Sequence, residues 1–244
     1  MKKILIMAIL VCAAFTACSN SADTETSQPA DTQQAAPADT ASADTAPAQS
    51  ADSASANDVS NNKSNYDFNE SELTKGHSNA EEIVIASDIT SIGSFAFKDC
   101  TTLKKVVIPD SVTTIGEYAF SGCTALETIQ IGSGVTSIGK NAFNGCKSVR
   151  MVTLPAGLTA IQDSTFSGCS SLVTCSLPEN LTSIGSYVFK DCASLKQLKI
   201  PASVTSIGSS AFDGCPSLKS IECAKGSAAD SQALYNADTV IVAN

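Results

Sequence analysis

The sequence repeats itself every 23 residues, and this period constrains the fold more than any other feature. The stretch Leu103–Ala125, LKKVVIPDSVTTIGEYAFSGCTA, contains the full pattern, which recurs without an insertion. Its most regular marks are an Ile-Gly pair, a Phe and a Cys, here Ile115-Gly116, Phe120 and Cys123. A fixed period of this length is typical of a solenoid, in which each repeat forms one coil that stacks on its neighbours.

Six copies of each mark define columns that run along the predicted solenoid. The phenylalanine column comprises Phe97, Phe120, Phe143, Phe166, Phe189 and Phe212. The cysteine column comprises Cys100, Cys123, Cys146, Cys169, Cys192 and Cys215. We interpret both columns as structural ladders inside the coils.

Each repeat begins with an alternating segment that Pro or Gly ends, and this pattern predicts a short β-strand. Seven such segments begin near Glu81, Lys104, Glu127, Arg150, Val173, Lys196 and Lys219. Stacked coils would pair these strands in parallel, at a spacing of about 4.8 Å. An Ala-Phe pair, present on the return path of four of the six repeats, predicts a single helical turn. The Gly or Asp before each column cysteine predicts a tight or left-handed corner.

The cysteine column allows three readings. Buried free thiols would fill a corner of each coil as small hydrophobic groups. Disulfides between neighbours require Cβ atoms about 3.8 Å apart, whereas in-register parallel stacking holds them nearer 5 Å. A metal site is disfavoured because sulfurs in a line cannot surround one ion tetrahedrally. We expect free thiols, and we expect no metal and no cofactor.

The repeated motif FxxCxxLxxIxIPxxVTSIGxxAF covers residues 80–223 and resembles the 23-residue leucine-rich repeat of BspA-like bacterial surface proteins. Three positions depart from the pattern: Ala80 and Val149 stand in Leu columns, and Gln162 replaces the Gly. The resemblance implies an α/β, strand-rich, right-handed solenoid with its parallel strands on the concave face. It also implies a role in adhesion.

The N-terminal residues predict export and anchoring. Residues 1–17 combine Lys2 and Lys3 with an apolar core too short to span a bilayer, as in a signal peptide. Phe15-Thr16-Ala17-Cys18 resembles a bacterial lipobox, which implies a lipid anchor on Cys18. Residues 18–65 are rich in Ala, Ser, Thr, Asp and Pro, and we expect a disordered stalk there. An ordinary secretory signal is the alternative.

The repeats should be closed at both ends, because an open coil exposes its apolar interior. Residues 66–79 are predicted to form an N-terminal cap, with Tyr66 and Phe68 over the first coil. Residues 224–244 are predicted to form a C-terminal cap, with a helix over 227–236 and a strand over 239–243.

Charge and residue usage exclude several functions. The net charge of −9 falls mostly on the residues before the repeats, which argues against a nucleic-acid partner. His77 is the single histidine, and no Gly-rich phosphate loop is present, so no Ser-His-Asp or nucleotide site can be assembled. We expect no catalytic residues and no enzymatic activity.

The outward positions of the predicted strands form the candidate binding face. Its residues are Lys105, Val107, Thr128, Gln130, Arg150, Met151, Thr153, Lys196 and Lys199. We expect this face to bind a protein or glycan outside the cell, while the lipid on Cys18 holds the chain at the cell surface or outer membrane. The alternative is a structural spacer or periplasmic assembly scaffold.

Overall fold

The computed structural model describes residues 65–231 and 240–243. The chain divides into two units, Met1–Ala51 and Asp52–Asn244, and every described residue belongs to the second. The predicted signal peptide, the lipidation site Cys18 and the stalk up to residue 64 lie outside the described residues. Within the part of the chain that the structure describes, no helix is long and apolar enough to span a bilayer.

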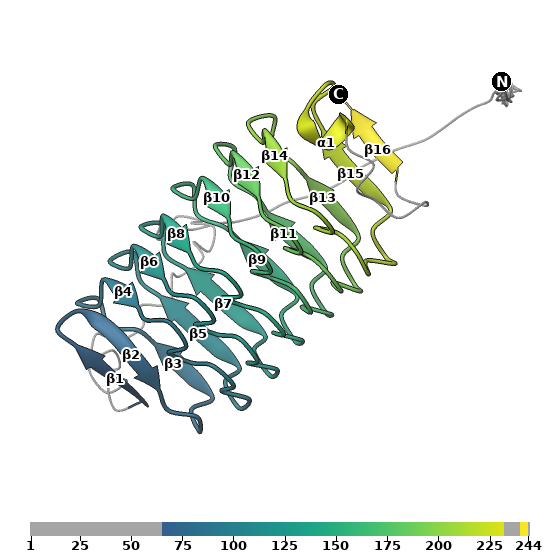
Figure 1. The fold of residues 1–244 in the computed structure, drawn as a ribbon. Coiled ribbons are helices and arrows are strands. Elements are labelled where there is room, and N and C mark those ends of the chain that lie inside the picture. The colour runs from purple at the N-terminus through teal and green to yellow at the C-terminus, as the bar shows by residue number, and fades with distance from the viewer. Residues whose placement is uncertain (1–64, 232–239, 244) are drawn as a thin grey trace, which may run out of the picture. The chain divides into compact units, whose positions relative to one another are not determined.

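The repeats form a strand-rich solenoid with almost no helix, and one side of it carries the longer strands (Figure 1). These are β3 (Glu82–Val84), β5 (Lys105–Ile108), β7 (Thr128–Ile131), β9 (Met151–Thr153), β11 (Thr174–Ser176), β13 (Gln197–Lys199) and β15 (Ser220–Cys223). Each begins one residue after the predicted start. Neighbours that pair do so in parallel and exactly one period apart, as in Val106 opposite Ile129. The predicted parallel solenoid is therefore confirmed.

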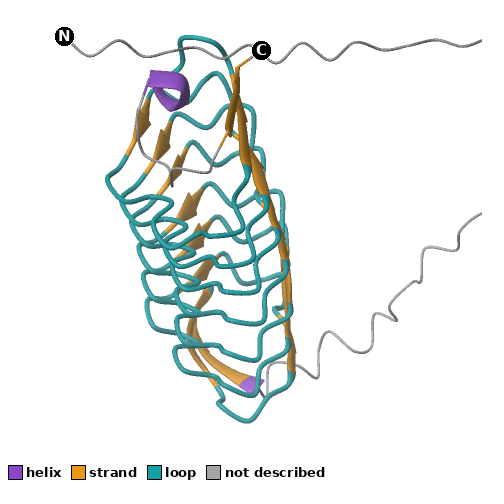
Figure 2. Ribbon diagram, turned by 90° about the vertical axis from the view of Figure 1, so that its right-hand side faces the viewer, coloured by secondary structure: helices purple, strands orange, loops and turns teal. Residues whose placement is uncertain are grey.

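A second set of two-residue strands lies on the opposite side of the coils (Figure 2). These are β4 (Ser91–Ile92), β6 (Thr114–Ile115), β8 (Ser137–Ile138), β10 (Ala160–Ile161), β12 (Ser183–Ile184) and β14 (Ser206–Ile207). They belong to the return path, and each ends at the isoleucine of the repeat. Because alternate residues point inward, that isoleucine is buried in every coil.

The interior is a continuous apolar core that runs through all coils. The six phenylalanine rings of the column stack nearly parallel, with centroids 4.9 Å apart at Phe97–Phe120 and 5.9 Å apart at Phe189–Phe212. The six column cysteines are buried beside them, and the described cysteines are all free thiols. Five of these thiols donate a weak hydrogen bond to a phenylalanine carbonyl of the preceding coil, as Cys146 does to Phe120 at 3.2 Å.

The predicted helical turn at the Ala-Phe pair is wrong. The residue before that pair has a left-handed backbone in every coil, for example Phe95 (φ 62°) and Tyr118 (φ 54°), so the chain makes successive turns instead. The amide of Phe97 bonds to the carbonyl of Ala119 in the next coil rather than within a helix. The predicted corner before each cysteine is confirmed, since those residues have φ between 59° and 77°.

Both ends of the described solenoid carry an extra element. At the N-terminal end, β1 (Tyr66–Asn69) and β2 (Glu72–Gly76) form an antiparallel hairpin, and β2 pairs with β4. Tyr66 is buried and its hydroxyl accepts a hydrogen bond from the amide of Ala86, whereas Phe68 is exposed and does not cover the first coil. At the other end, β16 (Val240–Ala243) pairs with β15, and α1 (Ala228–Ser231) is the described part of the predicted helix.

Candidate functional site

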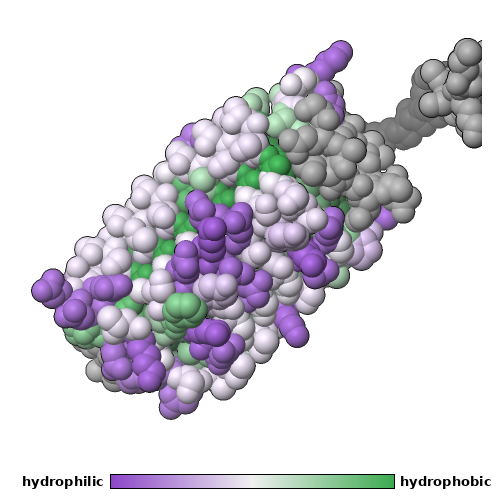
Figure 3. Space-filling view, viewed as in Figure 1, coloured by the Kyte–Doolittle hydropathy of each residue, from purple (hydrophilic) through white to green (hydrophobic). Residues whose placement is uncertain are grey.

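The long-strand face, which we define as the outward residues of β5 to β13 and the residue preceding each strand, contains all nine predicted binding residues. Seven of them are exposed, and Lys105 and Val107 are half-buried. Met151 is the most exposed large hydrophobic residue of the described chain, at 66%. In the space-filling view, hydrophobic surface runs lengthwise between hydrophilic side chains (Figure 3).

Ion pairs neutralise part of this face. The ammonium of Lys105 lies 2.6 Å from Glu82, and that of Lys199 lies 3.2 Å from Glu179. Arg150 and Lys196 have no ion-pair partner within residues 65–231. Exposed pairs of this kind contribute at most about 1 kcal/mol each to stability. The unpaired guanidinium of Arg150 is therefore the most available charge in the middle of the face.

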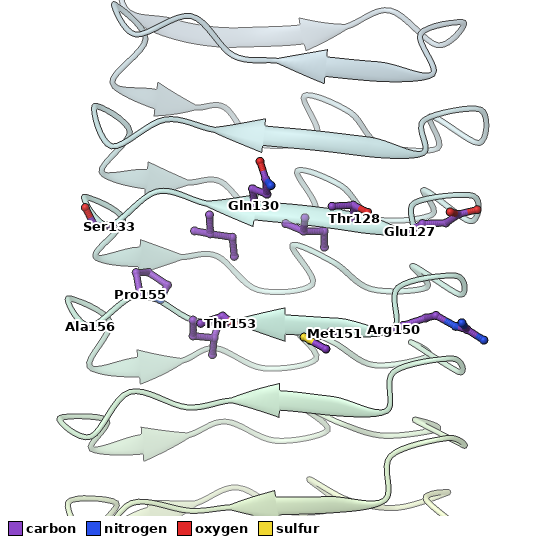
Figure 4. Close-up of a pocket in the computed structure, with 12 residues that line it drawn as sticks. Glu127, Thr128, Gln130, Ser133, Arg150, Met151, Thr153, Pro155 and Ala156 are labelled. Carbon is purple, nitrogen blue, oxygen red and sulfur yellow. The ribbon is translucent and has the colours of Figure 1, made fainter. Parts of the chain in front are cut away.

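Pairing between the long strands is interrupted twice, between β7 and β9 and between β11 and β13. Beside the second interruption the amide of Lys196 still bonds to the carbonyl of Val173, at 3.3 Å, and the short strands β12 and β14 pair. At the first interruption, the ladder β3–β5–β7 ends at β7, and a separate ladder begins at β9. The sheet of short strands is interrupted at the same junction, between β8 and β10. Figure 4 shows the two neighbouring strands at this junction, one carrying Thr128 and Gln130 and the other carrying Met151 and Thr153. We call this the open junction.

A groove of about 810 Å³ lies at the open junction. Ile129, Ile131 and Leu154 contribute its apolar part, and Glu127 and Arg150 lie at one end of the strands (Figure 4). Five of the nine predicted binding residues line it: Thr128, Gln130, Arg150, Met151 and Thr153. Met151, Thr153 and Lys199 also border a smaller groove over β9, β11 and β13. Lys105, Val107 and Lys196 line neither groove.

Gln162 explains why the coils separate on the return side. At Gly139 and Gly185, an added Cβ would lie 2.6–2.7 Å from a backbone nitrogen of the preceding coil, so only glycine permits that approach. Gln162 carries a Cβ at the same position of its coil. The amide of Gly185 bonds to the carbonyl of Ile161 in the preceding coil, and the corresponding bond from Gln162 to Ile138 is missing among the described backbone bonds.

The corner after β7 holds its coil against the preceding one. A Cβ at Gly132 or Gly134 would overlap the backbone of Pro109 or Asp110, so the two coils approach very closely here. The carboxylate of Asp110 accepts hydrogen bonds from the amide and hydroxyl of Ser133, at 2.6 and 2.9 Å. These bonds lower the pKa of Asp110. These contacts therefore hold the coil that contains β7 close to the preceding coil, and they do not involve the following coil.

The sequence showed part of this site. The departure at Gln162 was visible in the repeat pattern, but its consequence depends on clearance between coils, which the pattern does not contain. Glu127, Ser133 and Pro155 also line the groove and were not predicted as binding residues. The Gly-Ser-Gly corner in place of the proline found in most repeats is the signal that would have indicated them.

The remaining candidates for chemistry offer little. His77 lies 3.4 Å from the carboxylate of Asp67, and both side chains are exposed. Within residues 65–231 and 240–243, no group of three His, Cys, Asp or Glu side chains is arranged to hold a metal ion. The long-strand face and its grooves are suited to binding a partner through an extended surface.

The stacked coils and their phenylalanine ladder define a leucine-rich-repeat solenoid. The family described as "BspA type Leucine rich repeat region" matches residues 70–192 and 159–240, in six copies. This chain therefore belongs to the BspA-type leucine-rich repeat family. Proteins of this family are generally binding scaffolds without catalytic activity, and they are typically exported or located at the bacterial surface.

Three solved structures are similar. A leucine-rich cell surface protein from Faecalibacterium prausnitzii is 31% identical, with a TM-score of 0.51 over 65% of this chain and 52% of that one. A leucine-rich repeat protein of T. pallidum is 29% identical, with a TM-score of 0.47 over 66% of this chain and 69% of that one. One from Bacteroides ovatus is 31% identical, with a TM-score of 0.44 over 70% and 54%. This chain thus spans about half the length of two of them. The comparison with curated proteins gave no match.

Proposed function

We propose that this chain is a lipid-anchored protein of the bacterial cell envelope that binds a protein or glycan outside the membrane, without catalysis. The observation that carries the proposal is the groove at the open junction, which contains most of the predicted binding residues. Solenoids of stacked repeats commonly present such extended surfaces to partners. The similar protein from Faecalibacterium prausnitzii, described as a cell surface protein, supports the same location.

The anchor is proposed on Cys18. A lipid chain contributes about 0.8 kcal/mol per buried methylene, and two or more chains give stable membrane attachment. Replacing Cys18 by serine is expected to move the chain from the membrane fraction to the soluble fraction while leaving the solenoid folded. A chain that remains in the membrane fraction after Cys18→Ser would exclude this anchor.

Protease added to intact cells tests the orientation, and a binding assay tests the role. We expect protease to remove the chain from intact cells, and we expect the full chain to bind a matrix or envelope protein or glycan saturably. Protection from protease would instead favour a periplasmic spacer or assembly scaffold. Absence of binding across a broad panel of such partners would contradict adhesion.

A further inference from the structure

We propose that the open junction accepts an extended polypeptide segment as an added strand between β7 and β9, and that Gln162 keeps the junction open for it. The inference rests on the proposed binding function and gives that function a partner chemistry. It depends on the backbone groups left unpaired at the junction, on the bonds that persist there, and on the character of the groove.

At this junction, backbone amides and carbonyls that form hydrogen bonds between other neighbouring coils are left unpaired. The amides of Glu127 and Val173 bond to carbonyls one coil earlier, at Lys104 and Arg150. The corresponding bond from the amide of Arg150 to Glu127 is missing among the described backbone bonds, and β7 and β9 share no ladder. Two parallel strand edges therefore face each other with donors and acceptors available. Such edges are the features that bind an added strand.

The two coils remain joined around residues 141–145, the turn that carries Phe143. The amides of Asn141, Phe143 and Gly145 bond to carbonyls of the next coil at 2.8–3.0 Å, and the rings of Phe143 and Phe166 stack with centroids 5.6 Å apart. Lys140 and Asp163 form an ion pair across the same junction, at 3.2 Å. The hydroxyl of Ser148 also donates a hydrogen bond to the carbonyl of Thr124, at 2.7 Å, and so joins the two coils ahead of β7 and β9. The two strands themselves form no ladder, so further separation between them breaks no strand pairing.

The groove fits an extended peptide better than a sugar. A peptide offers amide donors and carbonyl acceptors at the regular spacing of a strand edge, whereas the polar groups of a glycan do not repeat at that spacing. The residues that line the groove include no aromatic ring on which a sugar could stack. Glu127 and Arg150 lie at one end and have no ion-pair partner among the described residues, so each is available to an opposite charge on the incoming segment.

The test uses peptides selected from a random displayed library on the full chain. We expect the selected peptides to slow hydrogen exchange in β7 and β9, and to lose at least about tenfold in affinity when alternate backbone amides are N-methylated, because methylation removes strand donors. Failure to select any peptide, protection elsewhere on the chain, or undiminished binding by the N-methylated peptide would each overturn the inference.

Two variants at position 162 distinguish the effect of the Cβ on the spacing of the coils from any direct contact between the Gln162 side chain and the peptide. Gln162→Gly removes the Cβ that keeps the coils apart, so it should close the junction and weaken the selected peptides at least about tenfold. Gln162→Ala keeps the Cβ and should bind within about twofold of the wild type. Equal binding by wild type and Gln162→Gly would overturn the role of Gln162. If an envelope partner binds the Gln162→Gly variant as well as the wild type, the proposed function stands and this inference fails.

Discussion

Replacing Phe143 by alanine is expected to lower the free energy of unfolding by about 4 kcal/mol, the usual cost of emptying a buried phenylalanine site. Phe143 is fully buried, and its ring stacks on those of Phe120 and Phe166 in the two neighbouring coils. Across the open junction neither the long strands nor the short strands pair, so the backbone bonds beside Phe143 and this ring stack hold the coils together. We therefore expect unfolding in urea to separate into two transitions, one for the coils on each side of the junction.

Phe120→Ala is the matched control. Phe120 is equally buried and also stacks on two rings. Its coil, however, is additionally paired with the next coil through β5–β7 and β6–β8. The cost in stability should be similar, and the transition should remain single. If the two variants unfold with the same number of transitions, then the junction after β7 is no weaker than its neighbour.

Stability is expected to fall steeply above pH 9, because the buried thiols resist ionisation. Burial raises the pKa of Cys123 and Cys169 to about 12 and that of Cys215 to about 11, and it also raises the pKa of Cys146, Cys175 and Cys192. In the unfolded chain these thiols ionise near pH 8.5. The native state therefore holds more protons at alkaline pH. The stabilisation is fully present below pH 8.5 and is lost as the pH rises towards the native pKa values.

Each such thiol removes roughly 1.4 kcal/mol per pH unit once its unfolded form has ionised. Six thiols acting together would exhaust a typical stability of 5–15 kcal/mol within about two pH units. Urea midpoints measured under reducing conditions between pH 8 and pH 10.5 would show this decline. The double variant Cys169→Ala and Cys192→Ala should reduce the slope by about one third. A midpoint that does not change over this range would contradict the burial of the thiols.

The repeat pattern predicted the parts of the fold that depend on burial. The Ile, Phe and Cys columns recur at a fixed spacing because each fills the same place in every coil, and the seven strands begin one residue from their predicted positions. The helical turn was predicted wrongly, because the Ala-Phe pair suits a helix and the left-handed backbone of the preceding residue is not encoded by a distinctive residue type. Phe95, Asn141 and Ser164 all adopt it.

The site was predictable only in outline. The outward strand residues follow from alternation, but nothing in their identity places Thr128 and Met151 beside a groove and Lys196 away from it. That difference arises from the distance between two coils. The distance depends in turn on a Cβ at Gln162, on the return side of its coil, and on the Gly-Ser-Gly corner at 132–134, which directly follows β7.

Hydrogen exchange of the free chain tests the central claim, that the coils before and after the junction lack strand pairing because of Gln162. We predict that the amides of Arg150 and Gln162 exchange at least about tenfold faster than those of Val173 and Gly185, their counterparts one coil later. In Gln162→Gly this difference should largely disappear. Equal protection of Arg150 and Val173 in the wild-type chain would contradict the account.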